Sequence, residues 1–350
     1  LLGLRYALNA GVRYVRTDQS SYGLNSGVTA TVDRHYDDWL PSVNIALFPA
    51  ENLIIRGAVA NVMTRPTLGS LTPGGSADGF NFRVTSGNPF LNPYRATNYD
   101  LAVEWYFAPQ AILSAALFQK NVHTFTQSAS VTGATFDQTG LPVSVLSPAS
   151  PAALNPALLS QPIWTLATTV NGSGATLKGL ELALQLPFKT FISEGFLSNF
   201  GIIANATFID SKSTFNLQGP ITTAFVPATG ALGPLSSVQL TENLSNVSPR
   251  AYNGTLYYDD GRFSARASVS YRGRYHEGAS GTGNLLEGFG ATTNVDASVR
   301  YRLTDWLELS VEGNNLLDTY RYRFTDIAAD RNYENNHFGR TILFGARLKL

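Results

Sequence analysis

Hydrophobic and polar residues alternate along much of this chain. The clearest stretch is NVDASVRYRLTDWLELSVEGNNL, which runs from Asn294 to Leu316. Between Val295 and Leu303 every second residue is apolar, and the residues between them are polar or charged. The alternation resumes at Leu307 after a short connection. A period of two predicts β-strands, because successive side chains point to opposite faces of a sheet, and the short connection predicts a hairpin.

Similar alternation recurs along the rest of the sequence. It predicts about twelve strands, near 5–20, 31–48, 51–64, 96–107, 110–127, 164–188, 198–212, 248–258, 261–277, 291–303, 305–323 and 337–350. Several exceed ten residues, whereas strands of soluble proteins usually have about 5–6. A tilted strand that crosses a membrane needs roughly 9–11 residues, so the lengths favour membrane-crossing strands.

The connections between these strands alternate in length. FPAEN, FAPQ, YDDGR and LTDW are tight turns, and segment 188–199 is the longer member of this series. Between them lie long connections near 65–95, 128–163, 213–247, 278–290 and 324–336. Short turns at one end of a sheet and long loops at the other are typical of outer-membrane β-barrels, whose short turns face the periplasm.

Aromatic residues lie beside the short turns, where a membrane interface would be. They are Phe48, Trp105, Phe107, Phe188, Tyr257, Tyr258 and Trp306. Aromatic rings favour the headgroup level, because an apolar body and a polar edge are both satisfied there. This favours a membrane barrel over a soluble β-sandwich or β-helix. We therefore expect one set of side chains to face lipid (Val269, Val299, Leu309, Leu348) and another to face the lumen (Arg266, Arg300, Glu308, Arg347).

Composition points the same way. Only 14% of the 350 residues are charged, against roughly 25% in a typical soluble protein. The net charge is zero, so there is no basic footprint for nucleic acid, and the absence of cysteine excludes disulfides and thiolate chemistry. The sequence contains no run of 18 or more apolar residues, so it predicts no transmembrane helix. Because the sequence opens directly on a strand without Met, we expect that the start of the natural chain is missing.

Several stretches together resemble the barrel of TonB-dependent outer-membrane receptors, in particular the branch found in Xanthomonas- and Caulobacter-type bacteria. They include LPSVNIALFPAENLIIRGAVANVMTRPTLGSLTPG, GNPFLNPYRATNYDLAVEWYFAPQAILSAALFQKNVHTF, VNGSGATLKGLELALQLPF, NVSPRAYNGTLYYDDGRFSARASVSYRGRY and VEGNNLLDTYRYR. The resemblance implies an all-β, antiparallel transmembrane barrel of about 22 strands with a plugged lumen. Residues 1–350 would form its C-terminal portion, without the N-terminal plug domain or signal peptide.

The resemblance also implies partners and a cellular location. The expected partners are the receptor's own plug domain, the inner-membrane TonB complex that acts through the plug, and the lipid and lipopolysaccharide of the outer membrane. The expected location is the outer membrane of a Gram-negative bacterium.

No catalytic motif, cofactor or metal site is predicted. The glycines complete no nucleotide-binding pattern, and the four histidines show no metal-ligand spacing. DRHYDD, from Asp33 to Asp38, is an acidic cluster that suits either a divalent cation or a solvated rim in contact with lipopolysaccharide. A barrel enzyme remains a third alternative without a supporting constellation.

Two sets of candidate functional residues remain. A charged wall facing the lumen would comprise Arg266, Arg272, Arg300, Arg302, Glu308, Glu312 and Arg347, serving either the plug and solute or ordinary cross-strand pairing. Ligand-binding rings in the long loops would be Tyr22, Phe80, Phe82, Tyr94, Phe136 and Trp164, although they could equally pack the loops together.

The predicted function is energised uptake of a scarce solute, and the alternative is a self-contained, passive pore of twelve strands. A glycan is favoured as the solute over a ferric siderophore. The resemblance to a branch often associated with carbohydrate uptake supports this, and so do loops whose cations (Arg65, Arg83, Arg95, Lys212 and Arg331) are scattered.

Overall fold

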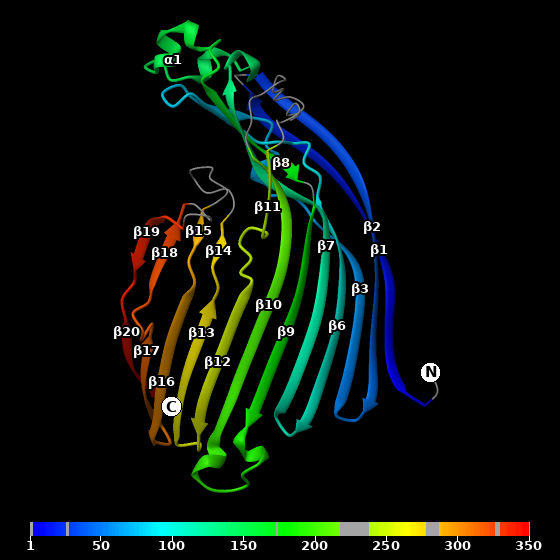
Figure 1. Cartoon of the computed structure of the whole chain (residues 1–350), viewed down its shortest axis with the longest axis vertical. Coiled ribbons are helices and arrows are strands. Elements are labelled where there is room, and N and C mark those ends of the chain that lie inside the picture. Colours follow the sequence, from blue (N-terminus) through cyan, green and yellow to red (C-terminus); the bar gives the residue numbers. More distant parts are fainter. Residues whose placement is uncertain are drawn as a thin grey trace.

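The fold is that of a single curved wall of strands, seen in a computed structural model of the whole chain. The structure describes residues 3–25, 28–139, 141–172, 174–217, 238–277, 287–325 and 330–349. Long antiparallel strands lie side by side, with the short turns at one end and the longer loops at the other (Figure 1). These ends are called the short-turn end and the long-loop end. Over the described ranges, no helix is long and apolar enough to span a membrane.

Twelve strands follow one another across the wall in sequence order, each antiparallel to the next. They are β1 (Arg5–Asn25), β2 (Val28–Ala50), β3 (Leu53–Thr64), β6 (Tyr94–Ala108), β7 (Ala111–Ala134), β9 (Ala175–Pro187), β10 (Phe200–Leu217), β12 (Arg250–Asp259), β13 (Phe263–Arg272), β16 (Thr292–Thr304), β17 (Leu307–Asn314) and β20 (Thr341–Leu348). Each coincides with one of the twelve predicted segments, so the prediction of strand number and order is confirmed.

Three predicted strands were wrong because each combines two strands of the structure. Segment 164–188 is two strands, β8 (Trp164–Gly172) and β9, which separate at Gly174. Gly174 has a φ of +58°, and a Cβ there would lie 2.7 Å from the carbonyl oxygen of Val122, so only glycine fits. Segments 261–277 and 305–323 likewise end early and continue as β14 (Tyr275–His276) and β18 (Tyr320–Phe324). In the latter, Asn315 and Asp318 have positive φ values and break the extended backbone.

The long-loop end carries two further substructures. Strands β14, β15 (Gly288–Phe289), β18 and β19 (Asn332–His337) form a small sheet above β13, β16 and β17. The second, called the loop layer, comprises the described residues of 65–93 and 135–164. It contains β4 (Gly75–Asp78), β5 (Arg83–Ser86), α1 (Pro151–Leu154) and four 3-10 helices, η1 (Leu68–Leu71), η2 (Asp137–Thr139), η3 (Val143–Val145) and η4 (Pro156–Leu158). The middle of the predicted loop 213–247 lies outside the described residues, as do residues 278–286 of loop 278–290.

Strand register sorts the side chains of the wall into two faces. The apolar face carries Val299, which lies opposite Val311, and Leu309, which lies opposite Ala346. The other face, called the polar face, carries Glu308 between its cross-strand neighbours Arg302 and Arg347. This is the division that the alternation predicts, because a slip of one residue would mix the two sets.

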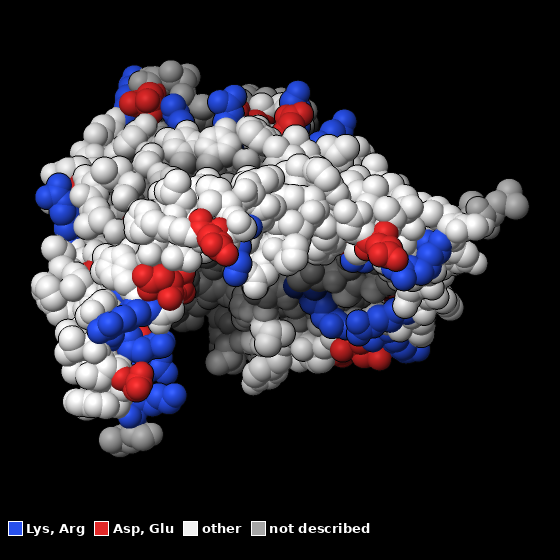
Figure 2. Space-filling view, turned by 90° about the horizontal axis from the view of Figure 1, so that it is seen from below, with Lys and Arg blue, Asp and Glu red and all other residues white. Residues whose placement is uncertain are grey.

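The apolar face has no covering layer within the part of the chain that the structure describes. Val269, Val299 and Leu309 remain 42–45% exposed, and Leu348 is 63% exposed. The main buried cluster lies instead in the loop layer. A soluble sandwich would bury this face against a second sheet, so its exposure favours contact with lipid. Seen from the short-turn end, the wall bends around a hollow, and several groups of charged side chains border that hollow (Figure 2).

Aromatic rings gather at two levels of the wall. At the short-turn end, Tyr258 lies 4.9 Å from Phe200 and 5.0 Å from Phe196, measured between ring centroids. Closer to the long-loop end, Tyr14 and Trp39 pair across β1 and β2 at 4.9 Å. The short-turn cluster lies where the sequence predicts an aromatic girdle, beside two more 3-10 helices, η5 (Phe188–Thr190) and η6 (Phe196–Asn199).

Candidate functional site

The polar face carries the predicted charged wall. A guanidinium nitrogen of Arg300 lies 3.3 Å from a carboxylate oxygen of Glu312. Arg302, Glu308 and Arg347 occupy one cross-strand row. A pair of opposite charges on neighbouring strands stabilises a sheet by about 0.2–1 kcal/mol, so ordinary cross-strand ion pairing explains much of this wall.

By register all seven predicted wall residues share this face, and one of them, Arg272, lies nearer the loops than the others. Arg266 lies opposite Ser298, which in turn lies opposite Glu312, so it belongs to the same face. Arg272 lies at the end of β13, where its guanidinium carbon is 3.7 Å from the centroid of the Tyr275 ring. That these side chains line the lumen of the complete barrel stays a prediction.

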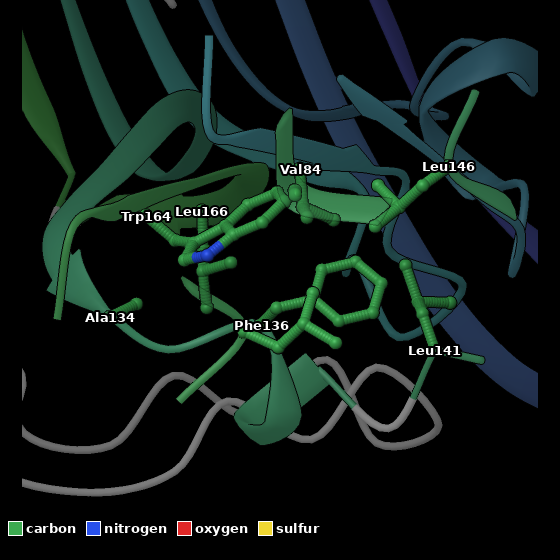
Figure 3. Packing of buried hydrophobic residues seen from close by; sticks show 9 residues of the cluster. Val84, Ala134, Phe136, Leu141, Leu146, Trp164 and Leu166 are labelled. Atoms are coloured by element: carbon green, nitrogen blue, oxygen red, sulfur yellow. The ribbon is translucent and has the colours of Figure 1, made fainter. Parts of the chain in front are cut away.

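The loop layer is held by its own hydrophobic core (Figure 3). Trp164 is completely buried, and its indole nitrogen donates a hydrogen bond to the carbonyl oxygen of Leu158 at 2.9 Å. The ring of Phe136 lies 4.8 Å from that of Trp164, and the ring of Phe82 meets it edge-on at 5.5 Å. The core therefore joins segments from the two long connections on either side of β6 and β7.

Packing divides the six rings predicted to bind a ligand. Trp164 and Phe136 are buried and Phe82 packs against them, so in this structure these rings hold the loop layer together. The Tyr94 hydroxyl is hydrogen-bonded to Thr126. Only two of the six present large apolar surfaces, Tyr22 at 68% exposed and Phe80 at 53% exposed. A role in ligand binding stays a prediction, and these two rings have the surface to fulfil it.

A turn at the tip of the loop layer fixes the position of Phe80. One carboxylate oxygen of Asp78 accepts the backbone N–H groups of Phe80, at 2.9 Å, and Asn81, at 3.2 Å. The other accepts the Asn81 side-chain amide at 2.7 Å. These hydrogen bonds, the one from the Asn81 amide above all, hold the pKa of Asp78 below its usual value. The charged carboxylate thus closes the turn that exposes Phe80.

The acidic cluster at Asp33–Asp38 does not converge on one point. Asp38 is buried, and its carboxylate lies 2.5 Å from the guanidinium of Arg95. The adjacent Asp37 points to the other face and accepts a hydrogen bond from the Tyr14 hydroxyl at 2.7 Å. Throughout the described ranges, no group of three or more histidine, aspartate or glutamate side chains is arranged to hold a metal ion.

One charged group was not identified from the sequence. Arg323 on β18 lies 2.8 Å from Glu277, 3.1 Å from Glu334 and 3.7 Å from Glu287. The Asn336 amide and the Arg323 guanidinium lower the pKa of Glu334. The alternation of RYRF is visible in the sequence. The partners of Arg323, however, come from β19 and from the connections on either side of 278–286, and no rule of sequence spacing brings these segments together.

The wall's geometry defines a class of protein. Long antiparallel strands with an uncovered apolar face, a polar reverse face and aromatic bands form the wall of a transmembrane β-barrel. The family model described as TonB dependent receptor-like, beta-barrel matches residues 1–316, and the chain therefore belongs to this family. Membership confirms the predicted location in the outer membrane of Gram-negative bacteria and the resemblance to TonB-dependent receptors.

Solved structures of the same fold include receptors and a transporter. The siderophore receptor PiuA from Acinetobacter baumannii is 18% identical, with a TM-score of 0.60 over 98% of this chain and 40% of its own. The ferric yersiniabactin uptake receptor FyuA from Yersinia pestis is 14% identical, with a TM-score of 0.56 over 98% of this chain and 43% of its own. The copper transporter OprC is 15% identical, with a TM-score of 0.57 over 98% of this chain and 45% of its own.

These comparisons limit the alternatives. The chain spans less than half the length of these three solved structures, and it has no match among the curated proteins. A self-contained pore of twelve strands is not favoured, since β1 and β20 each pair on one side only within the described residues. Family and neighbours are receptors and transporters, consistent with a protein that is not an enzyme. The bacterial branch stays a prediction.

Proposed function

We propose that the complete receptor takes up a scarce solute across the outer membrane with energy delivered through TonB. The observation that carries this proposal is the two-faced wall in a chain that belongs to the TonB-dependent receptor family. The apolar face would contact lipid, and the polar face would surround the plug.

The other parts of this function lie beyond the wall. The receptor's plug domain would fill the hollow and receive the energy from the inner-membrane TonB complex. Lipid and lipopolysaccharide would cover the apolar face. Both are proposals that rest on family membership.

A glycan is the solute that we propose first. The two exposed rings at the long-loop end, Tyr22 and Phe80, offer flat apolar surfaces, and neutral polar side chains are frequent in the loop layer. Such surfaces suit a sugar ring, with a few polar groups to fix its orientation. A ferric siderophore is the second candidate. The solved structures of siderophore receptors support it. A group of arginines near the long-loop end of β13 also supports it, namely Arg272, Arg274, Arg321 and Arg323.

The test is uptake by cells that express the full-length receptor, with and without functional TonB. Radiolabelled oligosaccharides and ferric chelates would be compared in wild type, Tyr22→Ala and Phe80→Ala, with Phe191→Ala as a control because it is 74% exposed but lies at the short-turn end. We expect TonB-dependent oligosaccharide uptake that both loop variants reduce and the control does not. TonB-dependent chelate uptake without oligosaccharide uptake would replace the glycan by the siderophore, and uptake independent of TonB would contradict the proposal.

A further inference from the structure

A polar pocket opens where the polar face meets the small sheet. Its volume is about 540 Å³, and its lining comes from β13 to β18 and from the connections beside them. The lining includes two guanidinium groups, two aromatic rings, an amide and a carboxylate, contributed by Arg272, Arg321, Tyr275, Phe289, Asn294 and Asp296. Asn294 and Asp296 lie in register with Ser270 and Ser268 on the polar face, so the pocket faces the same side as the charged wall.

Two guanidinium groups converge on one tyrosine in this pocket. The guanidinium carbon of Arg272 lies 3.7 Å from the centroid of the Tyr275 ring. A terminal nitrogen of Arg321 donates a hydrogen bond to the Tyr275 hydroxyl oxygen at 3.4 Å. The guanidinium carbon of Arg321 lies 3.7 Å from the centroid of the Phe289 ring. Stacking engages the face of a guanidinium and leaves the N–H groups in its plane to donate hydrogen bonds. Arg272 already donates from Nε to the Ser248 hydroxyl oxygen and from Nη2 to the Asn246 carbonyl oxygen, each at 3.1 Å, so its remaining Nη N–H groups are the ones left for a ligand.

These two arginines differ from the charged side chains around them. Arg323 has three glutamates nearby, and Arg274 lies 3.3 Å from Asp330. For Arg272 and Arg321, by contrast, no carboxylate lies within 4.0 Å in the part of the chain that the structure describes. Two like charges beside one tyrosine repel each other, and an anion bound between them would relieve that repulsion.

The rest of the pocket offers partners for hydroxyl groups. One carboxylate oxygen of Asp296 accepts the backbone N–H of Asn315 at 2.8 Å, which fixes the side chain and leaves the second oxygen to accept from a ligand. Asn294 adds an amide with both donors and an acceptor. A ligand held here would carry a negative charge on one side and hydroxyl groups on the other.

The Phe289 ring forms a platform beneath Arg321, and close packing shapes this platform. Phe289 is only 9% exposed, so its ring is held in place beneath Arg321. Next to it, a Cβ on Gly290 would lie 1.9 Å from the Tyr322 ring, and the Gly290 N–H donates to the Tyr322 carbonyl oxygen at 3.0 Å. Glycine thus lets β15 approach β18 and positions the platform in advance of binding.

We propose that this pocket binds the carboxylate of a hydroxyl-rich solute, with Arg272 and Arg321 holding the carboxylate and Asp296 and Asn294 holding its hydroxyl groups. The inference rests on the proposed uptake function and names the chemical class of its solute. An acidic sugar and a hydroxycarboxylate iron chelate share this chemistry. Planar arginine pairs match carboxylate oxygens through two parallel hydrogen bonds, which lysine does not reproduce.

The test is calorimetric binding to the purified full-length receptor. The probes are an oligogalacturonate, a neutral oligosaccharide of equal length, and ferric citrate. Wild type is compared with Arg272→Gln/Arg321→Gln and with Arg272→Lys/Arg321→Lys, which keeps both charges and serves if the first variant fails to assemble. Arg56→Gln is the matched control, since Arg56 lies on the same face by register but already has Glu104 as a partner at 2.8 Å.

We expect the wild type to bind at least one acidic probe and the glutamine variant to bind it at least about tenfold more weakly, with an intermediate loss in the lysine variant. The control should stay within about twofold, since its own partner neutralises it. The acidic probe that is lost identifies the source of the carboxylate. Binding of neither acidic probe by wild type, as when carboxylates of the plug fill the pocket, or equal binding by wild type and both variants, would overturn the proposal. Uptake that does not depend on TonB would instead contradict the proposed function and leave this binding result standing.

Discussion

At the residue scale, exposure separates aromatic rings that the sequence treats alike. Trp164 and Phe80 are both rings in long connections, yet one is fully buried and the other half exposed. The sequence could name the rings, but it could not sort them, because their packing joins segments on opposite sides of two long strands. Asp78 shows the reverse case, since a turn of four residues fixes its partners locally.

The burial of Trp164 predicts a local loss of stability in the loop layer. Trp164→Ala removes a ring in contact with Phe82 and Phe136 and should destabilise the layer by about 3–5 kcal/mol, the usual cost of such a truncation. Limited proteolysis of the full-length receptor should then cleave within residues 135–163 much faster, while the barrel stays resistant. Leu154→Ala is the control, because that side chain lies in the same layer and is 72% exposed. Equal cleavage rates in wild type and Trp164→Ala would contradict this account of the core.

The turn at Asp260 predicts a pH dependence. Its carboxylate accepts the backbone N–H groups of Phe263 at 2.7 Å and Arg262 at 2.9 Å, and these bonds lower the pKa of Asp260. A lowered pKa in the folded state stabilises the turn above the ordinary carboxyl pKa of about 4, and the stabilisation is lost as the pH falls through the folded value. The urea midpoint of wild type should therefore exceed that of Asp260→Asn at pH 6, and the difference should shrink on acidification below about pH 4. A difference that does not vary with pH would count against this role.

At the element scale, the alternation of apolar and polar residues with a period of two predicted most of the strands. It located all twelve strands of the wall and both of their faces, because each face meets a uniform environment along the whole strand. It failed where a strand is interrupted, as at Gly174, because the alternation predicts one strand where β8 and β9 pair separately with β7 on either side of a residue with positive φ. The pocket at Arg272 and Arg321 was also missed, since the strands that carry them are far apart in the sequence.

Two neighbouring residues of β16 test the assignment of the faces. Val299→Arg places a charge on the apolar face and should destabilise the receptor by about 2–4 kcal/mol if the residue lies near the midplane of the bilayer. Ser298→Arg adds the same side chain to the polar face, between Arg266 and Glu312 in the register, and should cost much less. Urea unfolding of both full-length variants in lipid vesicles measures the difference. Equal costs at the two positions would contradict this assignment of the faces.

At the scale of the whole molecule, we expect the wall to be one part of a larger barrel. β1 and β20 each have one neighbour in the described residues, so both edges of the sheet present unpaired backbone groups. The curvature of a sheet depends on the strand number of its barrel, and a barrel of about 22 strands is wider than one of twelve. Family and fold could be predicted from the sequence because the strand pattern covers nearly the whole chain, whereas the solute depends on loops and a plug that the pattern does not describe.

The open edges predict the behaviour of the fragment. Residues 1–350 expressed alone and folded in detergent should not form the native transporter, and planar bilayer recordings should show no stable, discrete conductance. The full-length receptor, folded in the same way, is the reference for correct assembly. A reproducible conductance of one size from the fragment would support the twelve-stranded pore instead.

We expect one face of this wall to meet lipid and the other to meet the interior of the barrel. The chain contains no cysteine, so single cysteines can be introduced at positions 295 to 301 of β16 and labelled with an environment-sensitive fluorophore in the full-length receptor, after any cysteine elsewhere in it is replaced. Brominated lipid should quench the label at odd-numbered positions, and an aqueous quencher should act at even-numbered positions. Quenching without this period of two, or with the two sets exchanged, would contradict this orientation of the wall.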